Sequence, residues 1–355
     1  MKESVKNYKR IVVKIGSSLF CSEKFELNTA LFNNISSQII SLINSDKEVV
    51  VVSSGAIALG MRILGLKTRP KELSFLQASA AIGQNALMDN YSAAFKKDNL
   101  TCAQVLLTWD DFDNRKRYLN AKNTILTLLK LKSIPIINEN DTVSTDEIRF
   151  GDNDQLSARV ANLISADLLI ILSDVDGLLD RDKKVIPVID KVTPEVKLLA
   201  NPTNKQTCAG GMITKLEAAA IVSGSAISCV ITNGRRNNVL LETVNNIGSS
   251  GTLFIPGKGH LAEKKRWIAF GTKSKGRIII DDGAKNALLN KKSLLSVGVA
   301  ALEGNFDAGN IVSIADKQGN EFARGKTILS SKQLDKVKGI RTDKEVVHCD
   351  NIVIL

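Results

Sequence analysis

The sequence predicts an α/β protein, a three-layer sandwich around a mainly parallel sheet, followed by a smaller, mostly-β domain. Three observations support this. Apolar runs alternate with helical patterns up to about residue 233, and several of these runs are apolar at consecutive positions. After residue 257 the pattern changes to short alternating runs separated by turns. Consecutive apolar positions are typical of strands that helices cover on both faces.

Six apolar runs predict the strands of the large domain. They span residues 10–16, 48–56, 100–107, 133–138, 167–174 and 227–234. Helical spacing of apolar residues lies between them, near 28–45, 56–66, 117–132, 155–165 and 212–224. Because strands and helices alternate, we expect βαβ units and a parallel sheet.

The C-terminal part has a different pattern. Short alternating runs at 276–281, 296–304 and 309–325 are separated by turns rich in Gly, Asn and Asp. We therefore expect a large domain over residues 1–257 and a small, mostly-β domain over residues 262–355.

Composition narrows the class of protein. The 355 residues are 44% hydrophobic and 24% charged, which is ordinary for a globular protein. No apolar run approaches the roughly 18 residues of a membrane span, and the N-terminal "MKESVKNYKR" lacks the apolar segment of a signal peptide. We expect a cytoplasmic protein without a membrane partner. The five cysteines are scattered, so neither a disulfide framework nor a zinc site is indicated.

The formal net charge of +11 fits anionic substrates, nucleic acid or a solvated surface equally well. Aromatic residues make up only 5% of the chain, and the basic residues are spread along it. RNA binding is therefore possible but not favoured.

Small and polar residues follow four of the predicted strands. In an open α/β sheet, ligands bind at the carboxyl ends of the strands. Glycines there let backbone N–H groups approach an anion, and helix N-termini add positive charge. We therefore expect a phosphate site at this edge. The residues are Lys14, Gly16, Ser54, Gly55, Asn138, Asp141, Ser173 and Asp174.

Two familiar phosphate motifs are excluded. Gly271 and Gly276 have the spacing of a P-loop, but Arg277 and Ile278 follow where Lys and Ser or Thr are needed. No G-x-G-x-x-G follows the first strand. A P-loop and a dinucleotide fold are therefore not supported.

Two lysines indicate phosphoryl transfer. Lys14 interrupts an apolar strand just before Gly16, and Lys215 follows the glycine turn "AGGMIT" at a helix start. Either lysine alone is more often structural or solvated. Together, with no histidine near any motif, they fit a reaction that needs mainly positioning and charge neutralisation.

The segment "RFGDNDQLSARVANLI" places Asp152, Asn153 and Asp154 at a helix start, where such residues often only cap the helix. The functional alternative is that Asp154 holds Lys14 and Lys215 in position while Mg²⁺ bridges the nucleotide phosphates. We therefore do not expect protein side chains to form a metal site of their own.

Three further polar residues would bind the acceptor. Asp141 suits an ammonium group, and the amides of Asn138 and Asn153 suit carboxylate oxygens. The alternative is that "NENDTV" is an ordinary polar loop.

Six ordered segments carry a resemblance. The chain resembles the glutamate 5-kinase family of the amino-acid kinase superfamily over roughly residues 8–255, and its C-terminal part resembles a PUA domain. The segments are "VVKIGSS", "VVVSSGAIALG", "LNAKNTILTLL", "PIINENDTV", "FGDNDQLSARVA" and "GGMITKLEAA".

The resemblance implies transfer of the γ-phosphoryl group of ATP to the γ-carboxylate of L-glutamate, giving L-glutamyl 5-phosphate, the first step of L-proline biosynthesis. It further implies Mg²⁺ dependence, feedback inhibition by proline and a homo-oligomer, a dimer or tetramer.

The resemblance also assigns residues. Ser54, Asn138, Asp141 and Asn153 would bind glutamate, and Asp154 would organise the lysines. Gly16 and Gly55 would be backbone donors along the phosphoryl path. The nucleotide side would comprise Lys14, Ser173, Asp174, Ala209, Gly210, Gly211, Met212, Ile213, Thr214 and Lys215.

Two departures from the family pattern matter. Ala209 stands where the family pattern Gly-Thr-Gly-Gly-Met has threonine, which removes a possible phosphate hydrogen bond. Ser173 stands where several relatives carry threonine, which keeps the hydroxyl.

Two other functions stay open. A kinase of the same superfamily acting on aspartate, acetylglutamate or carbamate would share the fold and the lysines. The other alternative is an RNA-binding or RNA-modification factor, because PUA domains occur in such proteins. Against it, the sequence of the large domain shows no aromatic stacking platform.

Overall fold

We describe the protein from a computed structural model that covers residues 8–21, 25–143, 152–200, 211–257, 262–341 and 344–355. The chain divides into two compact units, Met1–Gly259 and His260–Leu355, hereafter the large and the small unit. Each is described by itself.

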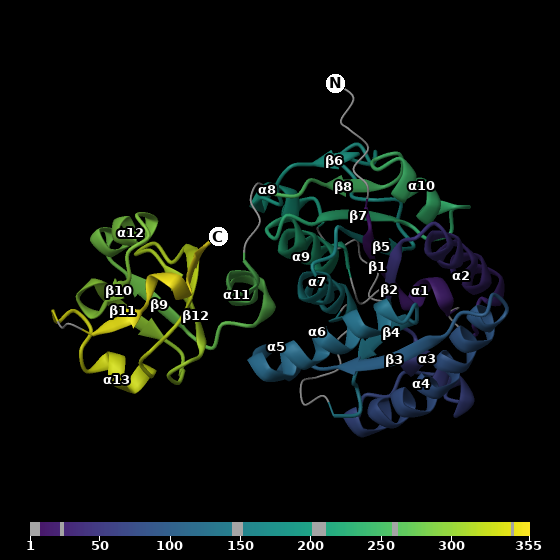
Figure 1. The fold of residues 1–355 in the computed structure, drawn as a ribbon, viewed down its shortest axis with the longest axis horizontal. Helices are drawn as coiled ribbons and strands as arrows, with labels where there is room; N and C mark the ends of the chain where they lie inside the picture. The colour runs from purple at the N-terminus through teal and green to yellow at the C-terminus, as the bar shows by residue number, and fades with distance from the viewer. Residues whose placement is uncertain (1–7, 22–24, 144–151, 201–210, 258–261, 342–343) are drawn as a thin grey trace. The chain divides into compact units, whose positions relative to one another are not determined.

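The large unit contains an eight-stranded sheet in the order β3-β4-β2-β1-β5-β7-β8-β6 (Figure 1). All neighbouring strands are parallel except β7 and β8, which pair antiparallel. The strands are β1 (Arg10–Ile15), β2 (Glu48–Ser53), β3 (Cys102–Leu107), β4 (Ile134–Glu139), β5 (Leu168–Ser173), β6 (Val188–Ile189), β7 (Ser228–Asn233) and β8 (Thr252–Phe254).

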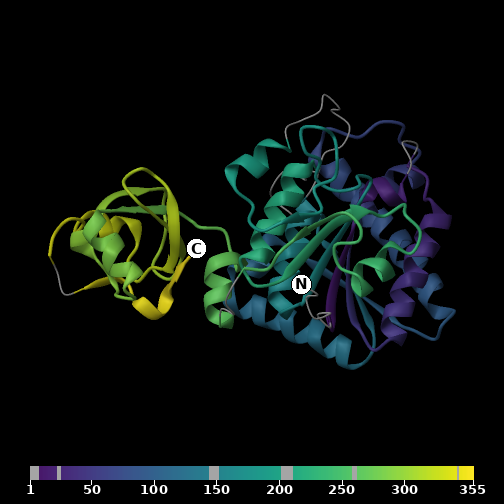
Figure 2. The same ribbon diagram turned by 90° about the horizontal axis from the view of Figure 1, so that it is seen from above.

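Helices cover both faces of this sheet (Figures 1 and 2). One face carries α6 (Arg115–Lys130), α7 (Asp152–Ile164) and α9 (Met212–Ser223). The other carries α2 (Thr29–Asn44), α4 (Leu73–Lys96) and α10 (Val239–Asn245). Shorter helices are α1 (Ser17–Phe20), α3 (Ala56–Ile63), α5 (Trp109–Asp113) and α8 (Pro194–Leu198). The predicted three-layer α/β fold is thereby confirmed.

The central strands of the sheet are almost completely buried. Strand β1 pairs with β2 on one side and β5 on the other, and five of its six residues are buried. Val13 and Ile15 belong to the large apolar core under α2 and α4. Because strand side chains alternate between the faces, Lys14 lies on the opposite face, toward α7.

Helix α4 was not among the helices expected from the sequence. Its buried positions follow helical spacing, but they include Ser79, Gly83 and Gln84, while Phe75 and Ile82 are exposed. Hydrophobicity therefore does not follow burial along this helix, and the one-sided apolar pattern that predicts a helix is lost.

Helices α3 and α4 cross with their backbones in contact. A Cβ on Gly83 would collide with the carbonyl oxygen of Ala56, and one on Gly60 would collide with that of Ser79. Only glycine lets two helix backbones approach so closely. The pair fixes the position of α3, which begins directly after Gly55.

The small unit is built around a five-stranded sheet in the order β11-β9-β12-β13-β15, beside a two-stranded pair of β10 and β14. It begins with α11 (Glu263–Arg266) and a π-helical turn, Trp267–Gly271. The later elements are β9 (Arg277–Ile280), α12 (Asp282–Leu289), β10 (Leu294–Leu295), β11 (Val299–Glu303), β12 (Ile311–Ala315), β13 (Glu321–Lys326), α13 (Ser331–Asp335), β14 (Glu345–Val347) and β15 (Ile352–Ile354). The expectation of a mostly-β texture is confirmed.

Among the described residues, every helix is too short or too polar to cross a membrane.

We predict that Gly83→Ala destabilises the large unit. Alanine normally stabilises a helix interior by about 1 kcal/mol relative to glycine, but here the added methyl group must displace the backbone of α3. We expect a loss on the order of 1–3 kcal/mol in the free energy of unfolding, typical of overpacking. Chemical denaturation measures it. Ala81→Gly, at an exposed position of the same helix, is the control for helix propensity alone. A Gly83→Ala protein as stable as the unchanged chain would show that the crossing tolerates a side chain.

Candidate active site

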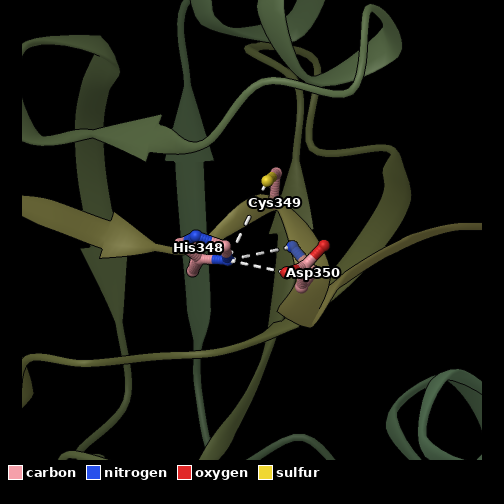
Figure 3. A group of neighbouring side chains, drawn as sticks. All are labelled: His348, Cys349 and Asp350. Atoms are coloured by element: carbon pink, nitrogen blue, oxygen red, sulfur yellow. Dashed lines mark hydrogen bonds and ion pairs between the residues drawn. The ribbon is translucent and has the colours of Figure 1, made fainter.

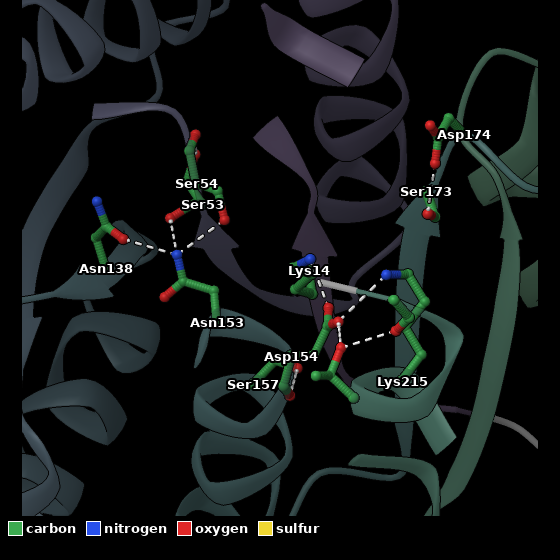
Figure 4. Close-up of polar contacts among 12 residues, drawn as sticks. Lys14, Ser53, Ser54, Asn138, Asn153, Asp154, Ser157, Ser173, Asp174 and Lys215 are labelled. Carbon is green, nitrogen blue, oxygen red and sulfur yellow. Dashed lines mark hydrogen bonds and ion pairs between the residues drawn. The ribbon is translucent and has the colours of Figure 1, made fainter. Parts of the chain in front are cut away.

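Asp154 is the common partner of two lysines (Figure 4). Its Oδ1 lies 2.5 Å from Nζ of Lys14, and its Oδ2 lies 3.3 Å from Nζ of Lys215. The hydroxyl of Thr214 donates to Oδ2 at 2.7 Å. The three charged residues come from β1, α7 and α9, so the site forms where these elements meet at the carboxyl edge of the sheet.

This charge cluster is almost completely removed from water. Lys14 is 5% exposed, Lys215 is 6% exposed and Asp154 is 0% exposed. Buried charges are tolerated only when they are paired and hydrogen-bonded. Two cations share one anion here, so the cluster retains one net positive charge and suits a polyanionic ligand.

The pKa values reflect both burial and pairing. Burial lowers the pKa of Lys14 below its ordinary value, although Asp154 opposes this shift and Lys215 adds to it. Burial alone would raise the pKa of Asp154, but the ammonium groups of Lys14 and Lys215 outweigh it, and the pKa lies below its usual range. Asp154 is therefore ionised at neutral pH.

The position of Asp154 in its helix argues against a capping role. It lies in the first turn of α7, two residues after Asp152, where the helix begins. The partners of its carboxylate are the two lysines and Thr214 rather than a backbone N–H of α7. The structure thus places Asp154 in contact with both lysines, and its role in organising them for catalysis stays a prediction.

A second polar cluster lies at the ends of β2 and β4 (Figure 4). Nδ2 of Asn153 donates to Oγ of Ser54 at 2.8 Å, to Oδ1 of Asn138 at 3.0 Å and to the carbonyl oxygen of Ser53 at 3.2 Å. Asn153 immediately precedes Asp154, so the first turn of α7 joins the two clusters.

The amide of Asn153 is oriented differently from the expectation. We expected it to meet a carboxylate, which requires a free N–H group. Its nitrogen, which carries two hydrogens, instead lies within hydrogen-bond distance of three protein acceptors, so no N–H group is left for a ligand. The atom left over is Oδ1, which is buried and has no partner among the described residues. An oxygen acceptor suits an ammonium group better than a carboxylate.

Asp141 lies in the turn after β4 and is half-buried. It is close enough to Arg69 that its charge opposes the lowering of the Arg69 pKa by burial. Arg69 comes from the segment between α3 and α4, which no sequence motif singled out.

The residues expected on the nucleotide side are only partly brought together. Ser173 is buried at the end of β5, and its hydroxyl donates to the exposed Asp174 at 3.1 Å. The negative charge of Asp174 is also one of the influences that raise the pKa of Lys14, against the larger effect of burial. Gly211, Met212, Ile213 and Thr214 open α9, whereas Ala209 and Gly210 lie outside the described residues.

The two glycines expected on the phosphoryl path, Gly16 and Gly55, have different backbone features. The N–H group of Gly16 donates to the carbonyl oxygen of Leu172 at 3.3 Å, so it is engaged within the sheet. Gly55 has φ of 112°, a backbone conformation that requires glycine, and no side chain crowds it.

Two residues of the site were missed by the sequence reading. Gln84 of α4 accepts a hydrogen bond from Nδ2 of Asn138 at 2.8 Å, and the hydroxyl of Tyr91 donates to Ser53 at 2.9 Å. The only feature of the sequence that pointed to Gln84 was a single glutamine within the segment "ASAAIGQNALM".

The small unit contains a separate group, His348, Cys349 and Asp350 (Figure 3). Nδ1 of His348 lies 3.8 Å from Sγ of Cys349 and 3.6 Å from Oδ2 of Asp350. The same nitrogen accepts from the backbone N–H of Asp350 at 3.2 Å. Because this bond occupies the lone pair that a metal would need, the group is explained as the cap of the short helix Cys349–Asn351.

Comparisons with known proteins agree with this architecture. Residues 9–233 match the model of the amino acid kinase family, and residues 276–348 match that of the PUA domain. A glutamate 5-kinase from a Thermoanaerobacter species is 43% identical over 364 residues, covering 98% of both chains. A glutamate 5-kinase from Citrifermentans bemidjiense is 42% identical over 372 residues, covering 100% of both.

A solved structure shares the fold at low sequence identity. The N-acetylglutamate synthase of Neisseria gonorrhoeae superposes with a TM-score of 0.53 at 15% identity, over 70% of this chain and 59% of its own. The family match and the full-length relatives together identify the chain as a member of the amino acid kinase family, within its glutamate 5-kinase group.

Proposed function

We propose that the protein transfers the γ-phosphoryl group of ATP to the γ-carboxylate of L-glutamate, giving L-glutamyl 5-phosphate and ADP in the cytoplasm, as the first step of L-proline biosynthesis. The observation that carries this proposal is the buried cluster of Lys14, Asp154 and Lys215, joined through α7 to the amide cluster of Asn138, Asn153 and Ser54. One cluster suits phosphate and the other suits an amino acid.

The lysine cluster fits the demands of phosphoryl transfer. Charge on the transferring phosphoryl group is spread over its oxygens, so catalysis is mainly positioning and neutralisation. Lys14 and Lys215 supply the neutralising charges, and Asp154 keeps these two cations side by side. Mg²⁺ would be held by the nucleotide phosphates, where it would neutralise further charge, because the carboxylate of Asp154 already faces two lysines and Thr214.

The acceptor explains why the site needs no histidine. The γ-carboxyl group of glutamate has an ordinary pKa of about 4.3, so it is ionised at neutral pH and requires no general base. A carboxylate oxygen attacks the γ-phosphorus, and the bond from this phosphorus to the oxygen bridging to the β-phosphate breaks, releasing ADP.

Asp141, Asn138, Asn153 and Ser54 are the proposed contacts of glutamate. Asp141 would pair with the ammonium group, which the free oxygen of Asn153 also suits, and the hydroxyl of Ser54 would face a carboxylate. The relatives' name, glutamate 5-kinase, supports glutamate over aspartate, acetylglutamate or carbamate as acceptor. Proline inhibition, a homo-oligomer and weak RNA binding by the small unit stay predictions.

We predict that the protein makes an acyl phosphate from L-glutamate. Incubation with ATP, Mg²⁺, L-glutamate and hydroxylamine should trap the product as a hydroxamate, with ADP released in equal amount. Parallel reactions with aspartate, acetylglutamate and carbamate are the comparison. Faster turnover with any of these three would reassign the acceptor.

We predict that Asp154→Asn lowers kcat by at least two decades, at roughly 1.4 kcal/mol per decade. The amide cannot hold two ammonium groups together, and leaving buried charges unpaired should also cost about 3–5 kcal/mol of stability. Rates are therefore compared at a temperature where circular dichroism shows the variant folded. Thr214→Val leaves the Asp154 charge between the two lysines and removes only a hydroxyl, which is placed to donate to Oδ2 of Asp154 at 2.7 Å and to the carbonyl oxygen of Gly211 at 2.9 Å, so it should lose much less. A folded Asp154→Asn protein with near-normal kcat would exclude the organising role.

We predict that Asp141→Asn raises the KM for glutamate about tenfold to a hundredfold, the effect of losing one charge-assisted contact. The KM for ATP should hardly change, because the nucleotide contacts lie at other strand ends. Asp98→Asn, at an exposed position after α4, is the matched control. An unchanged glutamate KM in the Asp141 variant would remove this residue from the acceptor site.

A further inference from the structure

A chain of hydrogen bonds runs from helix α4 to the acceptor side of the site. Nδ2 of Asn138 donates to Oε1 of Gln84 at 2.8 Å, and Oδ1 of Asn138 accepts from Nδ2 of Asn153 at 3.0 Å. Nδ2 of Asn153 then reaches Oγ of Ser54 at 2.8 Å. Gln84 is only 8% exposed and Asn138 only 2% exposed, so water cannot easily replace these bonds.

Two backbone groups fix the direction of this chain. The N–H group of Glu139 donates to Oδ1 of Asn138 at 2.9 Å, and the carbonyl oxygen of Ser53 accepts from Nδ2 of Asn153 at 3.2 Å. A backbone N–H can only donate and a carbonyl can only accept. Neither asparagine amide can therefore be turned over without losing a bond, and Asn138 must present its N–H groups to an acceptor.

Gln84 is the acceptor that Asn138 requires. Its Oε1 faces Asn138, and its Nε2 is buried without a partner among the described residues. Turning the Gln84 amide over would place two donors face to face. A polar side chain held in this orientation, at the cost of a buried unpaired N–H group, points to a role beyond packing.

The chain ends at the hydroxyl of Ser54. Because this oxygen already accepts from Asn153, the hydroxyl hydrogen is available for donation. Ser54 thus faces the acceptor site as a donor, which suits a carboxylate oxygen. If Asn138 lost its partner in α4, its amide would be held by fewer bonds, and the acceptor that it offers to Asn153 would be less firmly placed.

We propose that Gln84 is a positioning residue for the amino-acid acceptor: by accepting from Asn138 it holds in place an amide whose polarity the backbone sets, and through Asn153 it steadies Ser54 as a donor to a substrate carboxylate. This inference rests on the proposed function for the identity of that substrate. The hydrogen-bond chain itself is independent of the reaction.

The test compares two variants of Gln84. Gln84→Met keeps the length of the side chain but provides no good acceptor, and Gln84→Glu keeps an acceptor for Asn138. We expect Gln84→Met to raise the glutamate KM about tenfold, the effect of loosening one polar contact, with the ATP KM changed less than about twofold. Gln84→Glu should restore a substantial part of the lost affinity.

A double-variant cycle separates positioning from a general loss of structure. In a Ser54→Ala protein the end of the chain is missing, so adding Gln84→Met should raise the glutamate KM less than about twofold further. Gln38→Met removes another buried helix glutamine, which accepts from the N–H of Leu240 at 2.8 Å on α10. It should lower stability while leaving the glutamate KM unchanged.

The outcomes are distinguishable from those of the function assay. If the unchanged protein makes the hydroxamate from glutamate but Gln84→Met keeps its KM, or if the two substitutions are additive, the inference on Gln84 is wrong and the proposed function stands. If the unchanged protein does not phosphorylate glutamate, the proposed function fails. The same cycle measured on the free energy of unfolding then tests the chain, since additive losses there would show that Gln84 and Ser54 are not coupled.

Discussion

The large unit is arranged around a buried carboxylate held between two ammonium groups. Two lysines this close repel each other in a medium that water does not screen, so neither could stay in place without Asp154. The ion pairs join β1, α7 and α9 at one edge of the sheet, where all three charged side chains are almost completely buried. Lys14 makes this contact from the central strand β1, on the face opposite the apolar core. The placement of α7, and of the acceptor side that its first turn carries, follows from this contact.

Under the proposed function, the two halves of the site would select their ligands differently. The lysine cluster carries surplus positive charge. Its attraction for an anion extends over several ångströms and depends little on the direction from which the anion approaches. The amide cluster carries no net charge and depends on which atom of each side chain faces which neighbour. Phosphate groups are recognised mainly by charge and amino acids by the direction of hydrogen bonds. The boundary between the two modes is a single peptide, between Asn153 and Asp154.

Six of the eight strands of the large unit could be predicted, because burial on both faces leaves continuous apolar runs, and ligands gather where such strands end. The short strands β6 and β8 were not predicted, since two or three residues leave no such run. Lys14 was found because an ionisable residue interrupts such a run. Helix α4 could not be predicted in this way, since its buried positions include a serine, a glycine and a glutamine while a phenylalanine is exposed. Gln84 was missed for the same reason. The orientation of the Asn153 amide depends on the Ser53 carbonyl and on Asn138, residues distant in the sequence, so the residue type alone could not predict which of its two polar atoms is left without a protein partner.

The crossing of α3 and α4 gives the site a mechanical property. Backbone touches backbone at Gly60 and Gly83, with no side chain between them to rotate or compress. Helix α3 starts at the turn that carries Ser54, and Gln84 is the residue after Gly83. Both ends of the hydrogen-bond chain are therefore attached to one rigid body, and a shift of the Ser54 turn would carry Gln84 with it. Because Asn138 and Asn153 belong to β4 and α7, outside this body, any displacement of α3 and α4 would stretch the bonds at both ends of the chain at once.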